Sequence, residues 1–99
     1  MGNKAHNFLY ESFDIVNQTI YMEIDIAKDS FIILFGGQLE KLRKGHNLSL
    51  RQLATRCNID YSDISKIEKG KRNIQLSTVL ELSKGLNIHP KELLNFDIT

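Results

Sequence analysis

Apolar residues recur at intervals of three and four along most of this chain, and no other feature constrains its fold as strongly. The first stripe consists of Ile32, Phe35, Leu39 and Leu42, which share one face of a helix. Ser30 precedes this stripe and is placed to act as the N-cap, because its hydroxyl can accept a hydrogen bond from a backbone amide of the first turn. The pattern therefore predicts an amphipathic helix from about residue 31.

Short polar breaks divide the remainder of the chain into four further helical segments. Their apolar faces are Leu50, Leu53, Ala54 and Cys57; Ile64 and Ile67; Leu76, Val79, Leu80, Ser83 and Leu86; and Leu93 and Leu94. Ser49 and Gln52 have the spacing of a capping box, and Asn58 and Asn87 stand where a left-handed residue often ends a helix. Pro90 suits the first turn of the last segment, after a cap at His89. We expect an all-α fold of five short helices.

Only three residues, Asn58-Ile59-Asp60, separate the second helix from the third. Asp60 is a suitable N-cap for the third helix, which runs from Tyr61 to about Lys69 and stops at Gly70. Such a sharp turn is typical of the helix-turn-helix motif, in which one helix crosses the DNA backbone and the next lies in the major groove. By itself the spacing is a weak signal, because other helical bundles contain it.

Charge divides the chain into two parts. Residues 1–30 contain two basic and five acidic side chains, a net charge of −3, whereas residues 31–99 contain eleven and seven, a net charge of +4. A surface that binds a polyanion would therefore lie in the second part, although charge alone fits an ordinary solvated face equally well. We predict an acidic N-terminal extension over residues 1–30 and a DNA-binding domain over residues 31–99.

Two patterns overlap within this extension. Leu9, Phe13, Val16 and Ile20 are spaced as in a helix, and Ile20, Met22, Ile24 and Ile26 alternate with polar residues as in a half-buried β-strand. A lone strand needs a partner for its backbone groups. A strand here would pair with a second copy of the chain or within a local hairpin; one continuous helix or a flexible arm is the alternative.

The run from Phe35 to Phe96 resembles the Xre-type, lambda-repressor-like family of bacterial and phage DNA-binding regulators. The most specific segment is Ile64-Ser65-Lys66-Ile67-Glu68-Lys69-Gly70-Lys71-Arg72-Asn73, which resembles the family's third helix and the loop that follows it. The resemblance implies sequence-specific binding to double-stranded DNA and transcriptional regulation, with the third helix in the major groove. It favours a repressor that acts as a homodimer on a palindromic operator.

The resemblance also implies roles for particular residues. The base-reading residues would be Tyr61, Ser62, Ser65 and Lys66; the phosphate-binding residues would be Lys71, Arg72 and Asn73; and Arg43 and Glu68 would form a pair that orients the third helix. Arg51 and Gln52 are further phosphate candidates, because the N-terminus of a helix carries partial positive charge. Tyr61 could instead pack against its own helix, the basic loop could simply be solvated, and Arg43 and Glu68 could be unrelated charges.

Two residues depart from the family's pattern. The family commonly has Gln at the first position of the second helix, where it meets a phosphate, but this chain has Leu50, which cannot form that hydrogen bond. Asp63 lies on the predicted recognition helix, where a carboxylate would repel phosphates. Asp63 could accept a hydrogen bond from cytosine N4, or it could point aside.

No grouping of residues suggests an enzyme, a metal site or a cofactor. His6, His46 and His89 are scattered, and Cys57 lies on an apolar helix face, where a core role is expected. A single cysteine, no secretory signal and no apolar run longer than residues 31–35 indicate a cytoplasmic protein.

The predicted partners are an operator DNA and a second copy of the chain. Dimer contacts would come from the fifth helix and its continuation (Leu93, Leu94, Phe96 and Ile98), from the N-terminal strand, or from both. The alternative function is an antitoxin, or another protein-interaction module, that uses the same fold to hold a toxin and binds it through the acidic extension.

Overall fold

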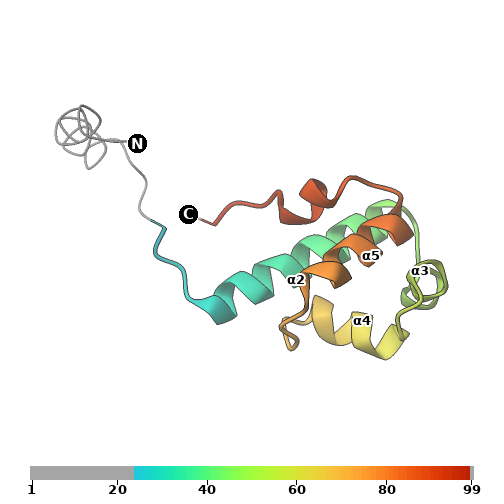
Figure 1. Ribbon diagram of the computed structural model, residues 1–99, viewed down its shortest axis with the longest axis horizontal. Coiled ribbons are helices and arrows are strands. Elements are labelled where there is room, and N and C mark those ends of the chain that lie inside the picture. The colour runs from blue at the N-terminus through green and yellow to red at the C-terminus, as the bar shows by residue number, and fades with distance from the viewer. Residues whose placement is uncertain (1–23, 99) are drawn as a thin grey trace, which may run out of the picture.

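The computed structural model describes residues 24–98, which form four α-helices and one 3₁₀-helix (Figure 1). These are α2 (Lys28–Gly45), α3 (Leu50–Cys57), α4 (Tyr61–Glu68), α5 (Leu76–Leu86) and η1 (Pro90–Leu94). The long helix α2 runs through the domain, and η1 and α4 pack on it separately; α5 packs against α3 and η1, and α3 also contacts α4 (Figure 1). The predicted all-α class is confirmed for this part of the chain, in which no helix is long and apolar enough to cross a membrane.

Three predictions about individual elements are wrong. The fifth helix is a 3₁₀-helix of five residues, a length too short for a regular α-helix to establish its i to i+4 ladder. Residues 24–26 form no strand, and no strand occurs elsewhere in residues 24–98 that could pair with them; the rest of the predicted strand lies outside the described residues. Ser30 is not an N-cap, because the Phe31 amide donates to the Ala27 carbonyl and Ala27 caps a helix that begins at Lys28.

Left-handed residues end the helices as the sequence indicates. Asn58 and Asn87 have φ values of 57°, and Asn47 and Gly70 have φ values of 58° and 73°. After α4, the Gly70 amide donates to the Ile67 carbonyl and the Lys71 amide donates to the Lys66 carbonyl, which is the Schellman pattern. This turn fixes the direction in which the basic loop leaves α4.

One hydrophobic core joins all five elements. Its buried members are Phe35, Leu39, Leu48, Leu53, Cys57, Ile64, Ile67, Val79, Leu82, Leu86 and Leu93. The backbone of α4 approaches α2 so closely at Gly36 that a Cβ atom there would clash with the Ile67 carbonyl oxygen and lie 2.7 Å from that of Glu68. Gly36 therefore sets the distance between α2 and the end of α4, whereas its neighbour Gly37 faces open space.

Candidate nucleic-acid interface

Helices α3 and α4 meet across the short turn that the sequence predicts. The capping box at the start of α3 is confirmed: the Gln52 amide donates to Ser49 Oγ at 3.0 Å, and the Ser49 amide donates to Gln52 Oε1 at 2.7 Å. Asn58 ends α3, and its amide donates to the Ala54 carbonyl. Asp60 occupies the N-cap position of α4, as predicted, but its side chain makes no capping hydrogen bond.

Helix α4 turns a polar face away from the core. Ile64 and Ile67 are buried beneath it, whereas Tyr61, Ser62 and Lys66 are exposed and Ser65 is half-buried. Serine hydroxyls and a lysine ammonium can donate to base edges. The structure therefore brings the four predicted base-reading side chains onto one accessible strip of one helix.

Arg51 and Tyr61 join α3 to the start of this strip. The Arg51 guanidinium lies over the Tyr61 ring, 4.0 Å from its centroid, which is a cation–π contact. Tyr61 is 41% exposed, so it packs against a side chain of the neighbouring helix rather than into the core. The contact holds a predicted phosphate ligand beside a predicted base-reading residue.

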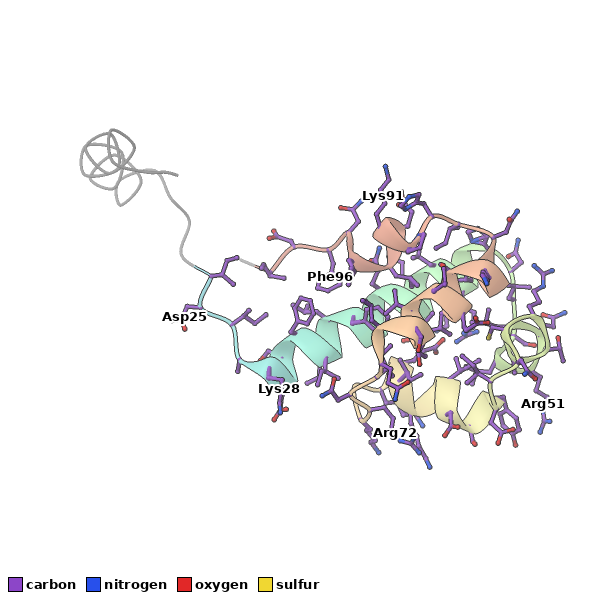
Figure 2. The ribbon with its side chains drawn as sticks, in the orientation of Figure 1. Asp25, Lys28, Arg51, Arg72, Lys91 and Phe96 are labelled. Carbon is purple, nitrogen blue, oxygen red and sulfur yellow. The ribbon has the colours of Figure 1, made fainter. Side chains whose placement is uncertain are left out.

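Arg72 and Asp63 form a second link, at the opposite edge of the strip. Arg72 Nη2 lies 3.2 Å from Asp63 Oδ1, and both side chains are partly exposed. Lys71 and Asn73 are also exposed in this loop. Figure 2 shows Arg51 and Arg72 on the α4 side of the molecule and Lys91 on the opposite side. The sequence did not predict that Asp63 pairs with Arg72, because the pair depends on the path of the loop after α4.

A buried ion pair fixes α4 to α2. Arg43 Nε donates to Glu68 Oε2 at 2.6 Å and Arg43 Nη2 donates to Oε1 at 2.9 Å, a bidentate arrangement, while Nη1 donates to the Leu48 carbonyl at 2.8 Å. The two side chains are 9% and 6% exposed. The hydrogen bonds to Glu68 raise the pKa of Arg43, so the guanidinium remains charged. The residues that the sequence pairs are thus in contact; their effect on DNA binding stays a prediction.

Gln52 and Cys57 have local partners. Because Gln52 uses its carbonyl oxygen in the capping box, its amide NH2 group is left to donate to a phosphate. Cys57 is buried, its thiol donates to the Leu53 carbonyl at 3.2 Å, and burial raises its pKa, which disfavours the reactive thiolate. Residues 24–98 contain no cluster of three or more His, Cys, Asp or Glu side chains that could hold a metal ion.

A two-helix turn with a polar helix face between two arginines defines a helix-turn-helix DNA-binding domain. The chain belongs to the helix-turn-helix (HTH_3) family, whose pattern it matches over residues 39–93, and the family that the sequence resembles is thereby confirmed. It is 38% identical over 65 residues to control protein C.BamHI of Bacillus amyloliquefaciens, covering 65% of this chain and 80% of that protein.

Solved structures of two restriction-modification controllers are similar to this fold. The restriction-modification controller protein C.AhdI of Aeromonas hydrophila is 37% identical, with a TM-score of 0.61 over 63% of this chain and 94% of that one. The restriction-modification controller protein C.Esp1396I, solved as a tetramer in complex with its natural 35 base-pair operator, is 25% identical, with a TM-score of 0.58 over 66% and 96% of the two chains.

Proposed function

We propose that this protein regulates transcription by binding an operator with α4 in the major groove, most simply as a repressor. The exposed strip of Tyr61, Ser62, Ser65 and Lys66 carries this proposal, because those side chains lie outside the hydrophobic core and can reach base edges. The chain is similar to restriction-modification controllers. The genes of a restriction-modification system are therefore the first candidate targets to examine. Operator DNA would be met in the cytoplasm, and the function requires no catalysis and no cofactor.

The phosphate contacts would come from both ends of the strip. Arg51 and Gln52 stand at the start of α3, and Lys71, Arg72 and Asn73 stand in the loop after α4. Phosphate contacts position a protein on DNA and make its affinity depend on salt, whereas contacts to base edges provide the specificity. The ion pair of Arg43 and Glu68 would hold α4 at the angle that lets both groups of residues act together.

A homodimer would place two copies of α4 on the two half-sites of an operator, about 34 Å apart, which is one turn of DNA. Leu93, one of the residues predicted to contact the second copy, is fully buried and cannot do so. We assign the contact to an apolar patch of Leu76, Leu80 and Leu94, whose exposed fractions are 81%, 44% and 46%. Leu76 and Leu94 line one groove of about 320 Å³, and Leu80 follows Leu76 by one helical turn.

Selection of bound sequences from a random pool of duplex DNA tests the function directly. The expected result is one enriched sequence with two related half-sites, bound with an affinity that falls as salt rises. Fluorescence anisotropy on that sequence and on a scrambled duplex then gives the specificity. Equal affinity for both duplexes would contradict the proposal.

A further inference from the structure

Asp63 is the only acidic residue on the exposed side of α4. On a helical wheel it flanks Ser62 and Lys66, next to the basic loop, and its side chain is 41% exposed. Hydroxyl groups can donate and accept, and an ammonium donates only. Asp63, at the edge of the strip, is thus the one group on this side of α4 that, when ionised, can only accept a hydrogen bond.

Arg72 holds Asp63 in place through one carboxylate oxygen. The distance from Arg72 Nη2 to Asp63 Oδ1 is 3.2 Å, and the side chains are 45% and 41% exposed. Arg72 has five N–H donors, so it can bind a phosphate with its remaining groups while it keeps the pair. The pair therefore reduces the repulsion between Asp63 and the DNA backbone, and the carboxylate stays exposed enough to accept a hydrogen bond from the groove.

We propose that Asp63 is a specificity residue, which accepts a hydrogen bond from an exocyclic amino group of the operator while Arg72 holds it and binds the adjacent phosphate. In the major groove only cytosine N4 and adenine N6 offer such a donor. Guanine and thymine present acceptors there, which the carboxylate would repel. Each base pair has one such amino group in the major groove, on the strand that carries its cytosine or adenine. Asp63 therefore selects cytosine or adenine on one strand at one position of each half-site, and it weakens binding when guanine or thymine stands there instead.

The assignment rests on the proposed function, and the variant Asp63→Asn tests it. Asparagine keeps the size of the side chain but loses the charge and gains a donor. Glu81→Gln is the matched control, because it removes the same charge from α5, where Glu81 lies 3.9 Å from Lys84 and outside the strip. Thermal unfolding followed by circular dichroism establishes that both variants fold.

The selection experiment is repeated with the wild type and both variants. We expect the wild type and Glu81→Gln to select the same cytosine or adenine. Asp63→Asn should lose about tenfold of the discrimination against guanine and thymine at that position only, because its amide NH2 can donate to their acceptors. Affinity of Asp63→Asn for a scrambled duplex should rise, because a carboxylate no longer repels the phosphates, and its salt slope should stay unchanged, because Arg72 keeps its phosphate contact.

The outcomes separate the two proposals. If the wild type selects no sequence, the proposed function fails. If the wild type and Asp63→Asn select the same sequence with the same preference at every position, Asp63 does not read a base, and the proposed function stands. If Glu81→Gln changes the preference as much as Asp63→Asn, the effect comes from net charge and the assignment is overturned.

Discussion

Lys66 is the only basic residue of α4, and its exposed position on the strip suits a contact to guanine O6 and N7. Lys66→Ala should reduce discrimination at one base position by about 1–3 kcal/mol and leave affinity for other sequences nearly unchanged. Anisotropy titrations on operators with single base-pair changes measure this effect. A uniform loss over all of these duplexes would show that Lys66 contacts phosphate instead.

Arg72 should behave differently from Lys66, because it stands in the loop beside the strip. Arg72→Ala should weaken binding to every sequence and flatten the salt slope by about 0.9, since one phosphate contact is lost. Titrations at several salt concentrations measure both quantities. Loss of affinity for the operator alone, with no change in slope, would contradict a phosphate role.

At the scale of single residues, the sequence predicts contacts between residues that lie close together along the chain. The capping box of Ser49 and Gln52 is confirmed because its two residues are three apart and need no other part of the fold. The contact between Arg51 and Tyr61 requires the angle between two helices, and the pair of Asp63 and Arg72 requires the path of a loop. Neither could be deduced from spacing along the chain.

At the scale of the helix, Gly36 is a second example of a contact that cannot be deduced from spacing along the chain. Within a helix a glycine usually costs stability, and the sequence gives no sign that Gly36 and Gly37 differ. The structure separates them, because only Gly36 lies against the last carbonyl groups of α4. The family resemblance predicted which helices form the motif, whereas this close approach could be seen only once α2 and α4 were packed together.

Substitution of these two glycines should have opposite effects. Gly36→Ala should destabilise the fold by about 1–3 kcal/mol, because the added Cβ would overlap backbone oxygens that cannot move independently. Gly37→Ala should stabilise it by up to about 1 kcal/mol, since α2 gains a better helix former in open space. Urea unfolding of both variants measures the difference. Equal stabilities would show that α2 and α4 are not packed as described.

Variants of the Arg43–Glu68 ion pair can separate its effect on the orientation of α4 from its effect on stability. Glu68→Gln should cost about 3–5 kcal/mol, because it leaves a buried guanidinium without its counter-charge. The double variant Arg43→Met with Glu68→Leu should recover most of that stability, since apolar residues of similar volume can replace a buried pair. Urea unfolding measures both free energies.

If the pair orients α4, the double variant should still bind its operator more weakly than the wild type. The reason is that packing alone sets the angle of the helix less strictly than two directed hydrogen bonds do. Anisotropy titration of the folded double variant gives the comparison. Wild-type affinity and specificity in this variant would reduce the role of the pair to stability.

Association of two chains is a property of the whole molecule. The apolar patch of Leu76, Leu80 and Leu94 is exposed on α5 and η1, and its groove has Arg72 and Asn73 among its lining residues. A second copy on this patch would therefore cover it beside the loop of Arg72 and Asn73, which is proposed to contact the DNA backbone. In such a dimer the exposed leucines of the two copies would cover one another, and this burial of apolar surface would stabilise the association.

Leu76→Lys combined with Leu94→Lys should convert the dimer to a monomer, because two ammonium groups would have to be buried in the apolar contact. Sedimentation velocity at tens of micromolar measures the change, and operator affinity should fall by at least tenfold as the two half-sites are no longer bound together. Ile24→Lys places the same charge on the N-terminal segment, where Ile24 is 65% exposed. If that variant alone is monomeric, the dimer forms through the N-terminal segment, and the assignment to α5 and η1 is wrong.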